Sequence, residues 1–282
     1  MPALTWGRSL LVFGILTGLA SANAQVAAQG EVPDFSSNLA GWVNIDMDFL
    51  PVPGAIAPTR NNPAYPYVSN QEARRAGTQP TFRVADLTNP NVKPWAKEIM
   101  KRENDKVLAG GIAYTPRSSC MPAGVPGYIG YGGNQPFYFI QTPQQVWMVF
   151  SGDQQVRRVY LNAPHSAKPK PSWYGESVGR YEGDTLVVDT IGLNDKTFVD
   201  NFRTPHSEKL HVVERYRLVE GGRFLQAEVL IEDPAVFIEP LKVTKRSRRV
   251  ETKLAEWRCA AGEINYFGYD ADPVPTATTP DF

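Results

Sequence analysis

Apolar and polar residues alternate along the second half of the chain, and this alternation predicts a run of β-strands. Turn-forming triplets such as Glu182-Gly183-Asp184 and Glu220-Gly221-Gly222 separate the alternating segments. The predicted strands are 137–141, 146–150, 156–161, 177–181, 185–193, 210–219, 224–231, 241–250 and 255–259. Strands joined by short turns pair with their sequence neighbours in an antiparallel meander. The pattern therefore predicts a mainly β fold, a lipocalin-like barrel, with a two-sheet sandwich as the alternative.

The preceding part of the chain, residues 25–136, lacks this alternation. Residues 51–66 contain five prolines, which favour extended or irregular backbone. Apolar residues at helical spacing predict one helix over 92–108, ended by Gly110-Gly111. We therefore expect residues 25–136 to form an irregular N-terminal wrap with one helix, packed on a barrel domain of residues 137–282 that ends in a C-terminal tail.

The first residues have the pattern of an export signal. Arg8 precedes an apolar run over 10–20, and Ala22-Asn23-Ala24 follows as an A-x-A cleavage site. The run is too short to span a bilayer. We therefore predict a signal peptide over residues 1–24, a periplasmic or extracellular location, and no membrane span after cleavage.

The charge balance of the chain restricts the kinds of molecule that it is expected to bind. The chain has 29 Lys and Arg residues against 29 Asp and Glu residues, and this balance does not favour nucleic-acid binding. A basic run over 242–249 is interpreted as a solvated strand face.

The two cysteines, Cys120 and Cys259, predict one disulfide in an oxidising compartment. Neither has a second ligand at the short spacing of a zinc site, so no metal is predicted there.

Two carboxylates fall on strand faces that are otherwise apolar. Glu214 shares its predicted face with apolar residues of 210–219, and Asp189 does the same in 185–193. Either Arg157 or Arg158 could pair with an interior carboxylate, because they point to opposite faces of one strand. One interpretation is a structural ion pair, or a face exposed to solvent. The other is a polar site in a barrel cavity, where burial raises the pKa of a carboxyl group toward neutrality.

The segment 194–209 is longer than a hairpin loop, and it carries His206. Long loops at a barrel mouth often act as lids or binding walls. Asn194, Asp195 and Asp200 could hold calcium, although their spacing matches no known calcium loop. His165, which lies between prolines, is interpreted as a surface loop residue.

Residues Gly175-Glu176-Ser177-Val178-Gly179 match the G-x-S-x-G pattern of serine hydrolases. A nucleophile elbow needs a strand before the serine and a helix after it. Here the serine runs directly into a predicted hairpin. The match is therefore interpreted as coincidental.

The run Gly179-Arg180-Tyr181-Glu182-Gly183-Asp184-Thr185-Leu186-Val187-Val188-Asp189-Thr190 is followed by Pro205-His206-Ser207 and Glu214-Arg215. It resembles a group of uncharacterised secreted bacterial proteins that share a GRWEGDTLVVDT-GF block followed by PHS and ER. The resemblance covers roughly 120–259. Tyr181 and Leu193 stand where the group has Trp and Phe. It implies one shared domain and no particular activity.

Three functions follow from these features. The first is cofactor-independent acid–base chemistry (a lyase, isomerase or hydratase step) on a small apolar or aromatic molecule. The second is a periplasmic binding or carrier protein without catalysis, and the third a structural envelope-associated protein. The expected catalytic residues are Asp189, Glu214, His206 and Arg158. The expected substrate-binding residues are Arg157, Tyr160, Trp173, Lys196 and Tyr216.

Overall fold

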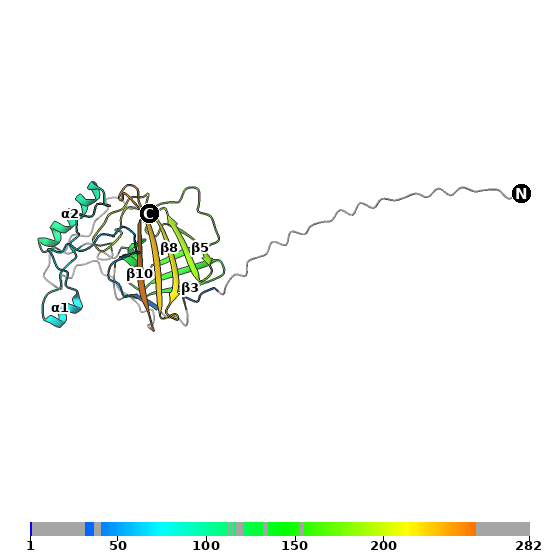
Figure 1. Cartoon of the computed structure of the whole chain (residues 1–282), viewed down its shortest axis with the longest axis horizontal. Helices are drawn as coiled ribbons and strands as arrows, with labels where there is room; N and C mark the ends of the chain where they lie inside the picture. The colour runs from blue at the N-terminus through cyan, green and yellow to red at the C-terminus, as the bar shows by residue number, and fades with distance from the viewer. Residues whose placement is uncertain are drawn as a thin grey trace.

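The strands of this protein close into a barrel, which confirms the predicted fold class (Figure 1). The computed structural model describes residue 1 and residues 32–36, 41–111, 113, 115–116, 121–131, 135–152 and 155–251. The strands in these residues are β1 (Gly41–Asn44), β2 (Leu50–Pro51), β3 (Phe137–Gln141), β4 (Gln145–Phe150), β5 (Val156–Leu161), β6 (Glu176–Glu182), β7 (Thr185–Ile191), β8 (His211–Val219), β9 (Phe224–Glu232) and β10 (Leu241–Val250).

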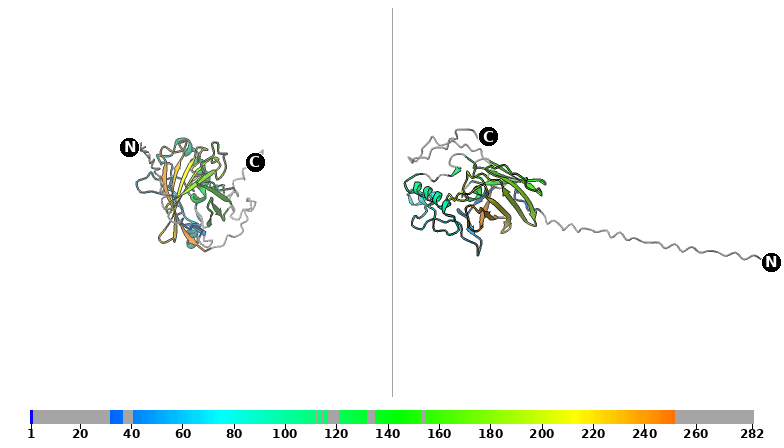
Figure 2. Two further views of the ribbon diagram at one scale, coloured as in Figure 1. Left: turned by 90° about the vertical axis from the view of Figure 1, so that its right-hand side faces the viewer. Right: turned by 90° about the horizontal axis from the view of Figure 1, so that it is seen from above.

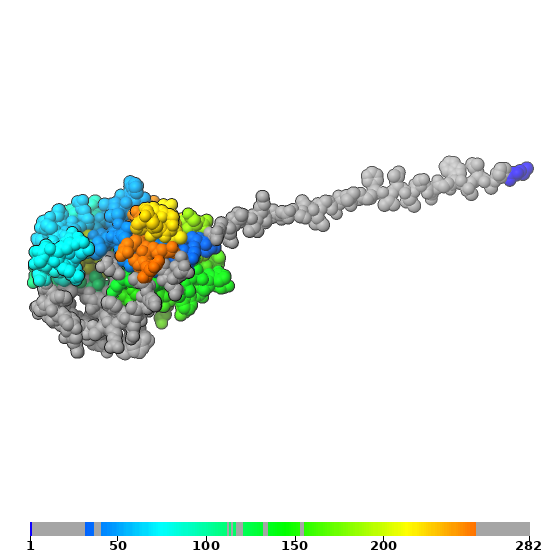
Figure 3. Space-filling model, turned by 90° about the horizontal axis from the view of Figure 1, so that it is seen from below, coloured from blue at the N-terminus to red at the C-terminus, as the bar shows by residue number. Residues whose placement is uncertain are grey.

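From β3 to β10 each strand pairs with the next one along the chain, as a meander requires. β1 closes the ring by pairing with both β10 and β3, and β2 lies outside it, paired with β10. Sequence patterning placed every barrel strand after residue 136 and so missed β1. In Figure 3, the blue segment that holds β1 and the orange end of β10 lie side by side, although they come from opposite ends of the described chain.

One strand pair departs from the antiparallel prediction. β5 and β6 run parallel, with Val159 opposite Ser177 and Leu161 opposite Gly179. The long connection over residues 162–175 makes this possible, because a parallel pair needs a crossover of about a dozen residues or more. The other ladders among the described residues of the ring are antiparallel.

Three helices occur in the described residues, where the sequence predicted one. The predicted helix is α2 (Pro94–Leu108), which buries Ala96, Met100 and Asn104. α1 (Asn70–Ala76) and α3 (Gly127–Gly130) were missed because they are too short to show periodicity. Figures 1 and 2 show α1 and α2 together on one side of the barrel. No helix in the described ranges is long and apolar enough to cross a membrane.

Aromatic side chains fill much of the barrel interior. Phe137 stacks on Phe150 with ring centroids 5.5 Å apart, and Phe139 meets the ring of Tyr216 edge-on. Trp42 of β1 is fully buried and donates its indole N–H to the carbonyl of Phe35 at 2.9 Å. These contacts join the N-terminal segment to the barrel core.

Several predictions fall on residues outside the described ranges and stay predictions. They are the signal peptide over 1–24, the strand over 255–259, and the disulfide between Cys120 and Cys259.

Candidate functional site

A charged pair lies in the barrel interior. Arg157 Nη2 donates to Glu214 Oε2 at 2.5 Å, and both side chains are buried. The hydroxyls of Tyr128 and Tyr216 donate to Glu214 Oε1 at 2.5 and 2.6 Å and also contact each other. The buried carboxylate therefore has both a cation and further donors, which a buried charge requires. We call Tyr128, Arg157, Glu214 and Tyr216 the interior cluster.

The other donors of Arg157 are engaged by the surrounding wall. Its Nε donates to Ser177 Oγ at 3.0 Å, and Nη2 also donates to Thr190 Oγ1 at 2.7 Å. Nη1 donates to the hydroxyl of Tyr128 at 2.8 Å. The interior cluster is thus a closed network that satisfies its own polar groups, and this is the arrangement that makes a buried ion pair stable.

Burial and the charge of Glu214 together set the protonation of the interior cluster. Burial, followed by the negative charge of Glu214, raises the pKa of Tyr128 and of Tyr216 well above the usual tyrosine value. Burial is the largest single effect on Arg157 and lowers its pKa, but the charge of Glu214, the hydrogen bond to it and the two tyrosine hydroxyls together outweigh burial, so the pKa of Arg157 is raised. The tyrosines therefore stay neutral donors and the arginine stays cationic.

The prediction that Glu214 faces the interior agrees with the structure, and its partner is Arg157 rather than Arg158. Tyr216, two residues along β8, shares its face, as strand geometry requires. Sequence reasoning missed Tyr128. It lies in α3, a helix of four residues that shows no periodicity in the sequence, and its buried hydroxyl reaches Glu214.

The expected position of Asp189 is wrong. Residues opposite each other on paired strands share a face, and Glu214 lies opposite Val188, so Asp189 points outward. There its Oδ1 meets His165 Nε2 at 2.9 Å and His211 Nε2 at 3.0 Å. The other ring nitrogen of His165 faces Glu176, and that of His211 faces Glu232.

Hydrogen bonds within this group of five residues shift the pKa values of Asp189 and His211 in opposite directions. The hydrogen bond to Asp189 is the largest effect on His211 and raises its pKa, while the bond from His211 is the largest effect on Asp189 and lowers its pKa. Carboxylates only accept hydrogen bonds, so the imidazolium form of His211, with two N–H donors, matches its position between Asp189 and Glu232. Asp189 therefore belongs to a surface ion network.

His206 lies apart from both carboxylates. It is buried in the 194–209 segment, where Nε2 lies 2.6 Å from Thr197 Oγ1 and Nδ1 lies 3.2 Å from the carbonyl oxygen of Ser207. The carbonyl can only accept, so Nδ1 carries the proton and Nε2 accepts from the threonine. Burial lowers the pKa of His206, which keeps the ring neutral. These contacts hold the segment together and leave His206 no shared site with Asp189 or Glu214.

The remaining candidates point outward or lie at the surface. Arg158 and Tyr160 project from the outer face of β5, and the guanidinium of Arg158 lies 5.3 Å from the ring of Trp147. Lys196 is exposed and Trp173 partly buried in connecting segments. Of the predicted catalytic and binding residues, Arg157, Glu214 and Tyr216 thus meet in the barrel interior.

The basic run over 242–249 was expected to be a solvated strand face, but one of its residues is buried. Lys245 points into the barrel and is 1% exposed. Its Nζ has no hydrogen-bond partner in the described part of the chain and lies 5.4 Å from the ring centroid of Phe49. Burial lowers the pKa of Lys245 to about 8.

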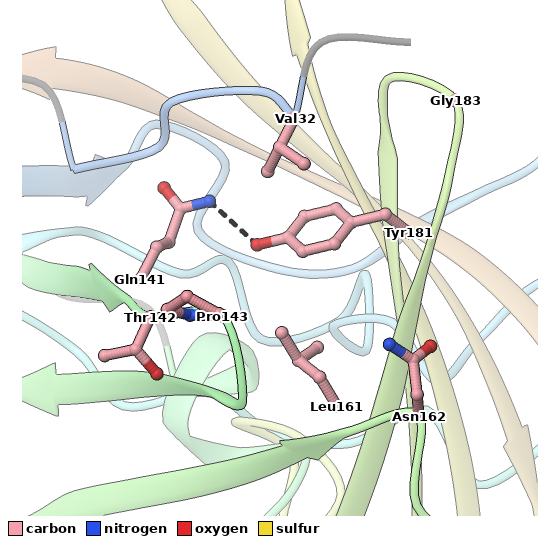
Figure 4. A pocket seen from close by; sticks show the side chains of 8 residues that line it. All are labelled: Val32, Gln141, Thr142, Pro143, Leu161, Asn162, Tyr181 and Gly183. Atoms are coloured by element: carbon pink, nitrogen blue, oxygen red, sulfur yellow. Dashed lines mark hydrogen bonds between the residues drawn. The ribbon is translucent and has the colours of Figure 1, made fainter. Parts of the chain in front are cut away.

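The structure has an open pocket of about 460 Å³ between the β3–β4 and β6–β7 hairpins (Figure 4). Gln141 Nε2 donates to the hydroxyl of Tyr181 at 2.8 Å across it. Burial raises the pKa of Tyr181, so its hydroxyl is neutral. We call this space the mouth pocket. Its lining is Val32, Gln141, Thr142, Pro143, Leu161, Asn162, Tyr181 and Gly183.

Within the described ranges, no group of three or more His, Cys, Asp or Glu side chains is arranged to hold a metal ion. In particular, Asp200, considered above for calcium, directs its carboxylate to the backbone and hydroxyl of Thr204 and to the N–H of Phe202. Comparison with protein-family models, curated proteins and solved structures gives no match to this chain.

Proposed function

We propose that this protein is an exported ligand-binding barrel that holds a small, uncharged molecule with an apolar or aromatic body in the mouth pocket. The observation that carries the proposal is the lining of that pocket. Leu161, Val32 and Pro143 supply apolar surface, while Gln141 and Tyr181 supply hydrogen-bonding groups. No ionised side chain lines it, and its volume of about 460 Å³ is in the range of small-molecule sites.

Binding without a chemical step fits the described residues better than acid–base catalysis. Catalysis was expected to need Asp189, Glu214 and His206 at one point, and they lie in three different surroundings. The carboxylate of Glu214 already accepts from three protein donors and none of the interior cluster lines the mouth pocket. A general acid or base must reach the substrate within hydrogen-bond distance.

A neutral aromatic probe, N-phenyl-1-naphthylamine, tests the proposal by fluorescence titration. Wild-type protein should bind it and increase its emission. Leu161→Glu places a carboxylate in the mouth pocket and should weaken binding about tenfold or more, because the ligand would have to desolvate that charge. Val32→Glu, which changes a half-exposed residue on the same pocket, should act in the same direction without disturbing the core.

The matched control is Ile140→Glu, on a neighbouring strand position that is 44% exposed and outside the pocket lining. It should bind the probe as wild type does. Thermal melts of all variants would verify that each is folded. Unchanged probe emission with the wild type, or equal binding by the pocket variants and the control, would overturn the proposal.

A further inference from the structure

The barrel wall opens where β5 and β6 separate. Their parallel ladder joins only residues 159–161 to residues 177–179. Residues 156–158 of β5 have no ladder partner on this side, and the chain enters β6 through Gly175, whose φ is +61°. A crevice of about 350 Å³ fills the gap. It is separate from the mouth pocket, because no residue lines both. We call it the wall crevice.

Two cations face the wall crevice without a carboxylate partner. Arg158 and Lys170 are both exposed, and neither forms an ion pair or a hydrogen bond with another described residue. Arg158 is instead held against the ring of Trp147. A pair of exposed cations beside one concave surface attracts anions from solution.

The one carboxylate that lines the wall crevice is already engaged. Glu176 Oε1 accepts from the backbone N–H of Ser166 at 2.6 Å and lies 3.1 Å from His165 Nδ1. The bond from Ser166 is the largest of the effects that lower the pKa of Glu176. Glu176 therefore does not neutralise Arg158 or Lys170 directly, and the crevice keeps an excess of positive charge.

The floor and walls of the wall crevice set the shape of a ligand. Arg157 and Ser177 form part of the floor, but Arg157 donates to Glu214, Tyr128, Ser177 and Thr190 and is not free to bind an anion. Tyr160, which is 42% exposed, and Tyr174 add aromatic surface beside the two cations. Aromatic rings pack well against flat ligands.

We propose that the wall crevice is a second binding site that takes an aromatic anion. Its carboxylate, sulfonate or phosphate group meets Arg158 and Lys170, and its ring lies against Tyr160 and Tyr174. Arginine and lysine donate strong, charge-assisted hydrogen bonds to such groups. The site is independent of the neutral ligand assigned to the mouth pocket.

The test uses two probes with the same ring system. 1-Anilinonaphthalene-8-sulfonate carries a negative charge, and N-phenyl-1-naphthylamine is its uncharged counterpart. The double variant Arg158→Gln/Lys170→Gln should bind the sulfonate about tenfold more weakly or worse, because two charge-assisted contacts are lost. Its binding of the neutral probe should not change. Leu161→Glu should show the reverse pattern, losing the neutral probe and keeping the sulfonate.

Arg217→Gln/Lys242→Gln is the matched control, since it removes two exposed positive charges elsewhere on the barrel. It should bind the sulfonate as wild type does. The proposal fails if the wild type does not bind the sulfonate, if the double variant binds it as tightly as the control, or if the double variant loses both probes together. Failure of Leu161→Glu to affect the neutral probe would count against the mouth pocket alone.

Discussion

Replacing Glu214 with glutamine should strongly destabilise the protein. The substitution keeps the shape of the side chain but leaves Arg157 as a cation that is 1% exposed and has no anion beside it. Glutamine also presents an N–H₂ group where the carboxylate accepts hydrogen bonds from Arg157, Tyr128 and Tyr216, so at least one donor loses its acceptor. Breaking a buried ion pair from one side costs about 3–5 kcal/mol.

The assay is equilibrium unfolding in urea, followed by tryptophan fluorescence and far-UV circular dichroism. The transition should move to lower urea with little change in slope. A domain of this size loses roughly 2–4 °C of Tm per kcal/mol, so thermal melts should shift by about 6–20 °C. Glu228→Gln is the control, because that carboxylate forms an exposed pair with Arg217 at 3.7 Å. It should cost less than about 1 kcal/mol.

A double-mutant cycle with Arg157→Met isolates the pair. If the charges depend on each other, the double variant should be more stable than the sum of the two single losses predicts. Arg157→Met alone leaves the carboxylate of Glu214 without its cation, so it too should destabilise. Strictly additive losses, or a Glu214→Gln variant as stable as Glu228→Gln, would refute the inference that this ion pair holds the barrel interior together.

Three further predictions concern other parts of the chain. The pKa of His211 is raised in the folded protein, so protonated His211 stabilises the fold fully below its unfolded pKa of about 6.5, and this stabilisation is lost as pH rises through the higher folded pKa. The Tm values of wild type and His211→Asn should therefore differ most near pH 6 and converge near pH 9. Gly175→Ala should cost more than Gly183→Ala, by at least about 1 kcal/mol in urea unfolding. Both glycines have φ near +60°, but a Cβ on Gly175 would lie 2.4 Å from the carbonyl oxygen of Ile191, and one on Gly183 would meet nothing, so equal losses would contradict the packing. Thiol titration of denatured, unreduced protein should find no free thiol if Cys120 and Cys259 are bonded, and two free thiols would exclude the disulfide.

The sequence alone determined most of the strands, because alternation of apolar and polar residues is a local property of each segment. The predicted bounds of β3, β5 and β10 match the structure, and the face of Glu214 was correct since one side of β8 is clearly apolar. In β7 the pattern failed. Residues 185–188 are all buried, so both faces are apolar and alternation carries no information about the direction of Asp189.

Tertiary structure decided which segments meet. The parallel pairing of β5 with β6, the closure through β1 and the insertion of Tyr128 depend on contacts between residues far apart in the chain. The choice of Arg157 over Arg158 depends on which face of β5 turns inward, and both faces carry an arginine. The two proposed binding sites follow in the same way, since the mouth pocket and the wall crevice exist only where separate strands and hairpins come together.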